Sequence, residues 1–432
     1  MMLSKYRRFL LTPKSCAKVN SCAKEWYIGK METVMVKLKH RLIKLLDGYH
    51  WATQSRWKLV LGFGSFVLIV WLIAWHTDQF VRDLGQLGST YGIPYWIVFL
   101  LASVLLLHEA DYKWKRDWIK LPVGLLCVFY IHYCYLSLLW IIFAGISWMQ
   151  PWVSNYASVL ILLLSGVFTA AGFQNTNRIK TTRYEIAIQG MRGTGRIVLI
   201  SDLHLGPFIR SGHVKRIVKK INVSSPELVI IAGDLIDEDH TILKNVKQRE
   251  KIVRYFRQIQ SQNGVLLTLG NHDPHADDPQ FRDFLKECNM RLLHNEVADF
   301  HGYYIIGRSD PTHNDRKAIH MLLNQCTEHK PIIVADHNPQ HIAEVMDAGV
   351  ALVLCGHTHA GQFFPANMAV KWVVGSNRFY GHHIEGSTQT VISSGAGCFN
   401  LPIRLGSHNE IVEIDLMNDE GILESEHSVT SI

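Results

Sequence analysis

Two stretches of the chain differ sharply in the spacing of their apolar and polar residues. Residues 57–172 contain long apolar runs with few charges, whereas residues 178–432 alternate short apolar runs with polar segments. An apolar run of about 18–20 residues is long enough to cross a bilayer as a helix. The first stretch therefore predicts four transmembrane helices, at about 57–76, 93–109, 121–148 and 152–172.

The second stretch predicts strands that alternate with helices. Strands are expected at 196–201, 227–232, 265–269, 303–306, 331–335 and 351–354. Helices are expected at 211–221, 247–260, 279–288, 315–326 and 339–347, and several short strands at 370–416. This alternation is typical of a mainly parallel sheet with helices outside it, in which ligands gather beyond the carboxyl ends of the strands.

Length and pattern together divide the chain into four parts, because 432 residues are too many for a single ordinary core. Residues 1–56 are a basic segment, 57–172 the four-helix transmembrane region, 173–195 a linker with an entry strand, and 196–432 the catalytic domain. The eight cysteines include no Cys-x-x-Cys pair, which favours reduced thiols over disulfides or a thiolate metal site. A buried, hydrogen-bonded histidine is the preferred interpretation of His132 in the third span.

The distribution of charge indicates a membrane orientation. Lys and Arg are frequent before the first span and after the second and fourth, and rare in the other two loops. This alternation places the N-terminus and the catalytic domain in the cytoplasm. Residues 31–49 have helical apolar spacing with a basic opposite face, which indicates a helix in the membrane interface or one packed on the domain. A membrane surface therefore explains the net charge of +7 better than nucleic acid, which is not an expected partner.

Five short motifs follow the predicted strands in a fixed order. They are Asp202-x-His204, Gly233-Asp234, Gly270-Asn271-His272-Asp273, His337 and Gly356-His357-Thr358-His359. Each motif alone is more often a turn or a packing feature. All five motifs in order, each at a strand end, are better explained by a shared functional site. Alternate residues of an extended segment face the same way. Asp202 and His204 are therefore expected on one side of their loop, and His357 and His359 on one side of theirs.

Seven side chains of these motifs are candidate oxygen or imidazole ligands, namely Asp202, His204, Asp234, Asn271, His337, His357 and His359. That number suits two divalent cations such as Mn²⁺, Fe²⁺, Zn²⁺ or Mg²⁺, with Mn²⁺ favoured over Mg²⁺ alone. Two cations sharing a carboxylate lower the pKa of a bridging water, so that a bridging hydroxide can attack phosphorus. Asp234 is the expected bridge, and His272 is placed to protonate the leaving group.

Residues 196–414 resemble the calcineurin-like metallophosphoesterases, in particular their membrane-associated bacterial branch. The resemblance implies a four-layer α/β/β/α sandwich. It also implies that Asp202, His204 and His359 hold one metal, that Asn271, His337 and His357 hold the second, and that Asp234 bridges them. His272 would be the catalytic acid or a stabiliser of charge on the phosphoryl oxygens. Asp273 would orient His272 or serve as a turn residue, and Asp237 would support its loop.

Two positions depart from the family pattern. Glu238 and Asp239 stand where protein phosphatases of this superfamily carry Arg-Gly, which disfavours a protein phosphatase. Ala360 replaces a usual glycine, and Gln362 either meets substrate or caps a loop. Near the motif loops, exposed positions are expected for His275, His382 and His383.

The sequence thus predicts a multi-pass inner-membrane phosphoesterase, more a phosphodiesterase than a protein phosphatase. The membrane anchor favours a phospholipid or lipid-linked headgroup as substrate, and a soluble nucleotide is the other possibility. The motifs do not distinguish a phosphodiester from a phosphomonoester substrate. A membrane sensor or scaffold that binds a phosphorylated ligand without turnover is the alternative function. A transporter is disfavoured, because the spans have almost no charged residues to line a path. The oligomeric state is unknown.

Overall fold

The computed structural model describes residues 117–147, 151–300 and 302–418, all within one compact unit, Val70–Ile432. The predicted spans at 57–76 and 93–109, and the basic helix at 31–49, lie outside the described residues. The third and fourth predicted spans correspond to helices α4 (Asp117–Ser147) and α5 (Pro151–Thr176). In the described part, one helix is long and apolar enough to cross a membrane, and its qualifying segment is Lys120–Ser137. The four-helix membrane region therefore stays a prediction.

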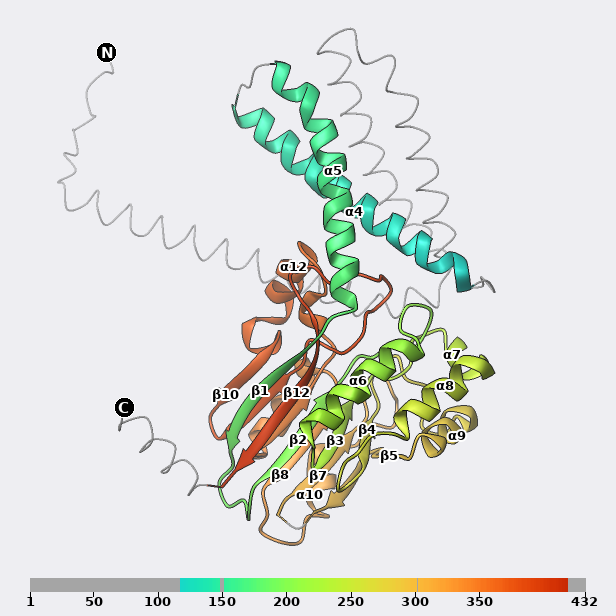
Figure 1. Ribbon diagram of the computed structural model, residues 1–432. Coiled ribbons are helices and arrows are strands. Elements are labelled where there is room, and N and C mark those ends of the chain that lie inside the picture. The colour runs from blue at the N-terminus through green and yellow to red at the C-terminus, as the bar shows by residue number, and fades with distance from the viewer. Residues whose placement is uncertain (1–116, 148–150, 301, 419–432) are drawn as a thin grey trace, which may run out of the picture. The chain divides into compact units, whose positions relative to one another are not determined.

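Two six-stranded sheets form the centre of the part of the chain that follows α5 (Figure 1). The first sheet has the order β1-β12-β2-β3-β4-β5. Its strands are β1 (Ile179–Ala187), β12 (Asn409–Met417), β2 (Gly195–Ile200), β3 (Leu228–Ala232), β4 (Val265–Thr268) and β5 (Met290–Leu292). The second sheet has the order β10-β11-β9-β8-β7-β6. Its strands are β10 (Gly381–Glu385), β11 (Thr388–Ile392), β9 (Leu352–Cys355), β8 (Ile332–Asp336), β7 (Tyr304–Arg308) and β6 (Glu296–Asp299).

Parallel pairing dominates the middle of both sheets. The strands β2 to β5 pair in parallel, as do β7, β8, β9 and β11. Antiparallel pairs join β12 to β2, β6 to β7 and β10 to β11. The sheets are therefore mixed, with a parallel centre as the strand–helix alternation predicts.

Helices cover the outer face of each sheet. Helices α6 (Ser211–Ser224), α7 (Thr241–Lys244), α8 (Val246–Phe256) and α9 (Pro279–Glu287) follow the strands of the first sheet. Helices α10 (Ile319–Leu323), α11 (Ala343–Asp347) and α12 (Ala366–Val374) follow strands of the second. Short 3-10 turns complete the set at Pro339–His341, His359–Gly361 and Ser376–Arg378.

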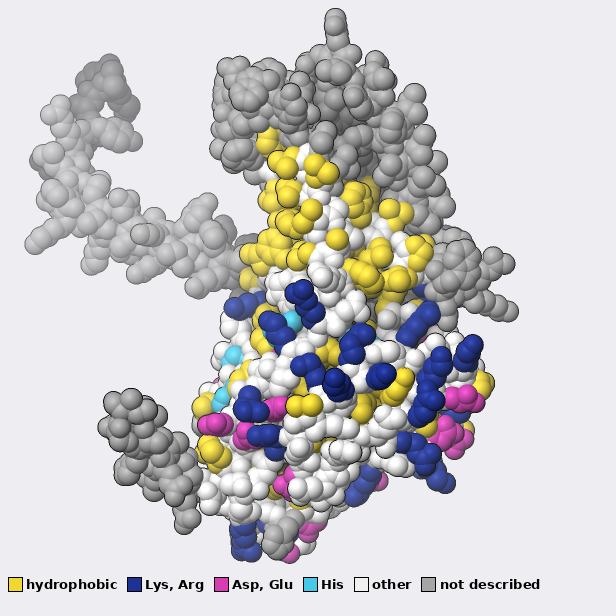
Figure 2. Space-filling view, in the orientation of Figure 1, with side chains coloured by type: hydrophobic (Ala, Val, Ile, Leu, Met, Phe, Trp, Pro, Cys, Tyr) yellow, Lys and Arg dark blue, Asp and Glu magenta, His cyan; other side chains and the backbone are white. Residues whose placement is uncertain are grey.

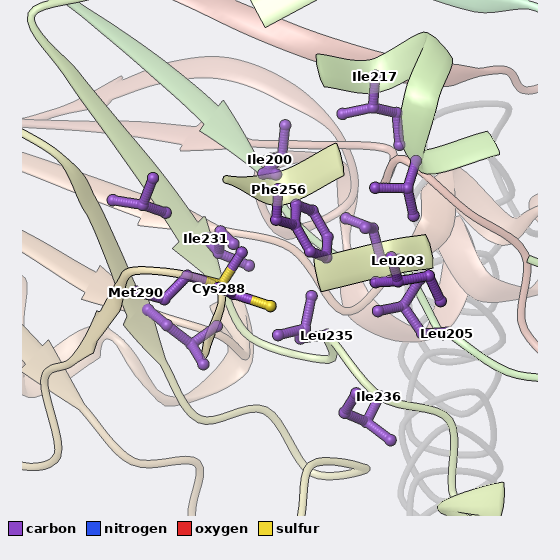
Figure 3. Close-up of a cluster of buried hydrophobic side chains, with 14 of the residues drawn as sticks. Ile200, Leu203, Leu205, Ile217, Ile231, Leu235, Ile236, Phe256, Cys288 and Met290 are labelled. Atoms are coloured by element: carbon purple, nitrogen blue, oxygen red, sulfur yellow. The ribbon is translucent and has the colours of Figure 1, made fainter. Parts of the chain in front are cut away.

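Alternating side chains along the strands build separate cores on the two faces of a sheet. On β2, Ile197 and Leu199 join the apolar cluster between the sheets. Val198 and Ile200 join the cluster beneath α6, α8 and α9 (Figure 3). A third cluster lies between β7–β9 and helices α10 and α11. The layers are thus helix, sheet, sheet and helix, as the family resemblance implies.

One predicted element has the wrong type. Strands were expected to begin at about residue 370, but α12 occupies Ala366–Val374. Its valines favour a strand locally, yet Val373 packs inward as part of a helical turn. The amphipathic packing of the helix therefore outweighs the local strand preference of the valines. Helix α10 is also shorter than expected.

Replacing Phe284 with alanine tests the helix-to-sheet core. Phe284 is fully buried on α9, so Phe284→Ala should lower the free energy of unfolding by about 3–5 kcal/mol. Denaturant titration of the purified chain measures the change. Val223→Ala, at a position that is 79% exposed, serves as the control and should change stability by less than about 0.5 kcal/mol. Equal effects of the two substitutions would contradict the packing described.

Candidate metal centre

The seven candidate ligands lie in loops at the carboxyl ends of five strands. Loops after β2, β3 and β4 of the first sheet carry Asp202, His204, Asp234 and Asn271. Loops after β8 and β9 of the second sheet carry His337, His357 and His359. The carboxyl ends of both sheets meet there, so residues as far apart as 202 and 359 become neighbours.

Asp202, His204 and His359 form a first group that could hold a metal ion. Nε2 of His359 lies 3.4 Å from Oδ1 of Asp202 and 3.1 Å from Nε2 of His204. All three side chains are buried. Three potential ligand atoms therefore converge on one small volume.

Asp234, His337 and His357 form a second such group. Nε2 of His337 lies 3.1 Å from Oδ2 of Asp234 and 3.3 Å from Nδ1 of His357. The amide oxygen Oδ1 of Asn271 is 2.9 Å from the same His357 nitrogen. Asn271 thus stands beside the second group.

The carboxylate of Asp234 lies between the two groups. Its Oδ2 is 3.1 Å from Nε2 of His337 in the second group and 3.6 Å from Nε2 of His204 in the first. Its Oδ1 accepts a 2.9 Å hydrogen bond from the backbone N–H of His272. One oxygen is fixed by the backbone while the other faces both groups.

The hydrogen-bonding pattern fits bound cations. Nδ1 of His337 donates to the carbonyl of Ala232 at 2.7 Å, which leaves Nε2 as the ring nitrogen that faces Asp234 and His357. Buried carboxylates need a counter-charge. Burial lowers the pKa of His337, but the Asp234 carboxylate beside it raises this pKa to well above its usual value. The buried carboxylate of Asp234 therefore stabilises positive charge between the two groups of candidate ligands.

Left-handed backbone places most of these side chains. Five of the seven candidate ligands have a positive φ, namely Asp202 (50°), His204 (48°), Asp234 (52°), His357 (71°) and His359 (52°). The ligand atoms of Asp202 and His204 lie together as expected. The expected reason, an extended backbone, is wrong, because both residues have a left-handed backbone. Non-glycine residues at positive φ are strained and cluster at functional sites.

Two motif glycines allow the loops to approach closely. A Cβ atom at Gly270 would lie 2.2 Å from Oδ1 of Asp234. One at Gly356 would lie 2.3 Å from Oδ2 of Asp202, whose oxygens accept the N–H of His357 at 3.0 Å. Any side chain at these positions would displace a candidate ligand.

His272 lies beside the first group. Its ring is 5.2 Å from the ring of His204 and 4.7 Å from the ring of Phe399. Burial lowers the pKa of His272 to about 4, against an opposing effect of Asp234. His272 is therefore a neutral imidazole at neutral pH, which favours hydrogen-bond donation to a phosphoryl oxygen over the role of a protonated acid.

The structure separates the supporting roles of two aspartates. Asp273 accepts the backbone N–H of Ile236 at 3.0 Å and that of Gly270 at 2.9 Å, so it ties two strand-end loops together. This arrangement favours the turn-residue interpretation of Asp273. Oδ1 of Asp237 lies 3.6 Å from Nδ1 of His204, on the ring edge away from the first group, and accepts the N–H of Glu238. Asp237 therefore supports its loop and the orientation of His204.

Sequence reasoning missed two residues next to the site. Arg404 is fully buried, donates from Nη1 to the carbonyl of His359 at 2.8 Å, and places Nη2 3.2 Å from Nδ1 of His359. The ring of Phe399 packs at a tilt against the ring of His272. Gln362 holds Phe399 in place by exchanging hydrogen bonds with its backbone at 2.8 and 2.9 Å. Gln362 thus fixes a loop. The sequence pattern of the loops around Phe399 and Arg404 gives no sign of these contacts.

The other three histidines that the sequence singles out lie in the loop after the Gly270 motif and on β10. His275 is 51% exposed and lies 3.4 Å from Asp315. On β10, His382 hydrogen-bonds with Gln389 and His383 with the carbonyl of Tyr380, and both are partly buried. The expectation of exposure is confirmed for His275 and is wrong for the other two, because strand pairing and these contacts cover them.

Comparison with known proteins agrees with the geometry. Residues 195–361 match the family described as calcineurin-like phosphoesterase. An uncharacterized metallophosphoesterase of Helicobacter pylori (strain J99 / ATCC 700824) is 29% identical over 262 residues, which are 59% of this chain and 69% of that protein. Another from Helicobacter pylori (strain ATCC 700392 / 26695) is 25% identical over 373 residues, 82% of this chain and 97% of that protein.

The name of a third similar protein refers to a membrane. The transmembrane protein with metallophosphoesterase domain of Danio rerio is 28% identical over 284 residues, 60% of this chain and 62% of that protein. The family match and the strand-end motifs concern the same part of the molecule. Residues 195–361 of this chain therefore belong to a calcineurin-like metallophosphoesterase domain.

Proposed function

We propose that the chain is a membrane-attached hydrolase that uses two divalent cations, Mn²⁺ favoured, to cleave a phosphoester. The observation that carries this proposal is the carboxylate of Asp234, which faces both groups of candidate ligands at 3.1 and 3.6 Å. A carboxylate shared in this way would hold two cations near one another, as in two-metal phosphoester hydrolysis. The arrangement supports hydrolysis more than a purely structural metal site.

The proposed roles follow the two groups of candidate ligands. Asp202, His204 and His359 would hold one cation, His337, His357 and Asn271 the other, and Asp234 both. Bound cations would activate a water and offset the negative charge that develops at phosphorus. The N–H of His272 would donate to a phosphoryl or leaving-group oxygen. Arg404 would act as a positioning residue, because it holds the backbone of His359.

The membrane setting motivates the substrate class. The apolar segment of α4 and the named membrane region of the Danio rerio relative support attachment to a membrane. A phosphodiester is preferred over a phosphoprotein, because Glu238 and Asp239 stand where protein phosphatases place the arginine that holds the phosphate. The substrate would be lipid-linked, in the inner membrane, with the catalytic domain on the cytoplasmic side.

Hydrolysis of a generic aryl phosphodiester and the matching monoester tests the reaction. The full chain in detergent with Mn²⁺ should cleave the diester faster, and a chelator should abolish cleavage. Asp234→Asn should lower the turnover number by about a hundredfold or more, since even residues behind metal ligands are worth about 10–100-fold. His382→Gln, on β10, should leave turnover unchanged.

The outcomes separate enzyme from binding protein. Two bound metals in elemental analysis without turnover of either substrate would favour the sensor or scaffold alternative. A folded chain that binds no metal would contradict the site. Faster monoester than diester cleavage would reverse the proposed substrate class and keep the metal chemistry.

Close packing at Gly356 predicts a linked loss of metal and stability. Gly356→Ala should push Asp202 out of the first group, because the new Cβ would lie 2.3 Å from its carboxylate. We expect less bound metal by elemental analysis and a loss of about 1–3 kcal/mol in the free energy of unfolding. Gly212→Ala is the control, because a Cβ there meets nothing within 4 Å among the described residues. Full metal content in Gly356→Ala would argue against the first group.

The cytoplasmic orientation has its own test. A reporter enzyme that is active only in the cytoplasm, fused after Ile432, should be active, because Lys and Arg are enriched on that side of the predicted spans. A second fusion, with a reporter active only outside the cytoplasm, should be silent. The reverse result would place the domain on the other side of the membrane and contradict the proposed orientation.

A further inference from the structure

Helix α12 presents an apolar face to solvent. Met368 is 63% exposed and Trp372 is 39% exposed, and their spacing of four residues puts them on the same face of the helix. Lys371 beside them is also exposed, whereas Val373 is buried against the domain. A helix with Trp, Met and Lys on its outer side is typical of one that lies in a membrane interface.

Helix α12 is attached to the loop of a candidate metal ligand. The turn His359–Gly361 precedes it by four residues. The N–H of Asn367 donates to the carbonyl of Phe363 at 2.9 Å, and a Cβ on Gly361 would lie 2.2 Å from Cα of Asn367. This close packing fixes the helix relative to the metal centre.

The apolar helix α4 contacts loops on the same side of the domain. The ring of Tyr135 lies 5.4 Å from that of Phe364, just before α12. Nζ of Lys120 lies 3.1 Å from Asp239, in the loop that follows Asp234. These contacts place α4 at the loops that follow candidate metal ligands.

Helix α5 ends on the same loops. The N–H of Arg404 donates to the carbonyl of Gly172 at 3.0 Å. Further back on α5, Leu160, Leu163 and Val167 are 55%, 63% and 58% exposed, and hydrophobic side chains gather over α4 and α5 in the space-filling view (Figure 2). The exposed apolar surface of these helices therefore starts at the metal-centre side of the domain.

Cations accompany this apolar surface. Arg216 on α6 donates to the side chain of Asn177, directly after α5, at 3.1 Å. Lys215 and Lys219 on the same helix are exposed, and Lys and Arg side chains gather over α6 (Figure 2). Basic residues next to a membrane segment attract anionic lipid.

We propose that α12 lies in the surface of a phospholipid bilayer, with Met368 and Trp372 among the acyl chains and Lys371 near the lipid phosphates. Its continuity with the apolar surface of α4 and α5, and the cations of α6, favour lipid over a protein partner. The metal centre then faces the headgroups, and its substrate is a phosphoester within a phospholipid headgroup. The statement about substrate rests on the proposed hydrolase activity, whereas the docking of α12 does not.

Photocrosslinking tests the docking without any need for turnover. Full-length chain with Trp372→p-benzoylphenylalanine, in nanodiscs of phosphatidylethanolamine and phosphatidylglycerol, should form a covalent lipid adduct detected by mass spectrometry. The same residue introduced at Met321 on α10, a position 51% exposed, should form none. A crosslink to a second copy or to another segment of this chain, or an absence of lipid adduct, would overturn the proposal.

A substrate comparison tests the consequence for catalysis. In Met368→Glu/Trp372→Glu, the ratio of phospholipid turnover in nanodiscs to aryl phosphoester turnover should fall about tenfold or more, because acidic side chains oppose insertion among acyl chains and anionic headgroups. Met321→Glu should leave this ratio unchanged. An unchanged ratio in the double variant would overturn the role of α12 in substrate access. If the wild-type chain cleaves neither substrate, the proposed activity fails, and the crosslink still decides the docking.

Discussion

Backbone hydrogen bonds between neighbouring strand-end loops are the constraint on which the metal centre depends. The backbone N–H of Asp202 donates to the carbonyl of Gly233 and that of His204 to the backbone carbonyl of Asp234, both at 3.0 Å. The carboxylate of Asp202 accepts the N–H of His357 from the loop after β9 of the other sheet. Each residue held at positive φ costs about 1–3 kcal/mol, a strain that persists only where the surroundings over-determine it. The buried core between the sheets supplies that support, because it keeps the two sets of carboxyl ends in register.

The sequence alone predicts the parallel centres of the sheets and the position of every candidate ligand. Buried strands leave a strong pattern, since short apolar runs such as 228–232 end abruptly in polar residues. Once the strands of one sheet are parallel, the residues after them must share one edge, so Asp202 and Asp234 lie in neighbouring loops after β2 and β3. Asp234 and His337 are 103 positions apart and meet because the carboxyl ends of the two sheets come together. The layer order, by contrast, came from the family resemblance, because apolar periodicity does not show which sheet a strand joins.

Contacts that cross the fold were not predictable from the pattern. Arg404 reaches His359 over 45 positions, and a lone arginine in a loop gives no sign of such burial. Phe399 is similar, since its role depends on packing against His272. The left-handed backbone at Asp202 was also missed, because aspartate is compatible with both extended and left-handed conformations and only the tertiary hydrogen bonds decide between them.

Asp234 makes ligand binding and cation binding interdependent. One of its oxygens accepts the backbone N–H of His272, and the other faces both groups of candidate ligands. A ligand that moves the His272 loop would turn the carboxylate that both cations would share, and a cation that fixes the carboxylate would resist this movement. By thermodynamic linkage, each binding event must change the affinity of the other by the same factor. The abundance of substrate would then influence how firmly the protein retains its metals.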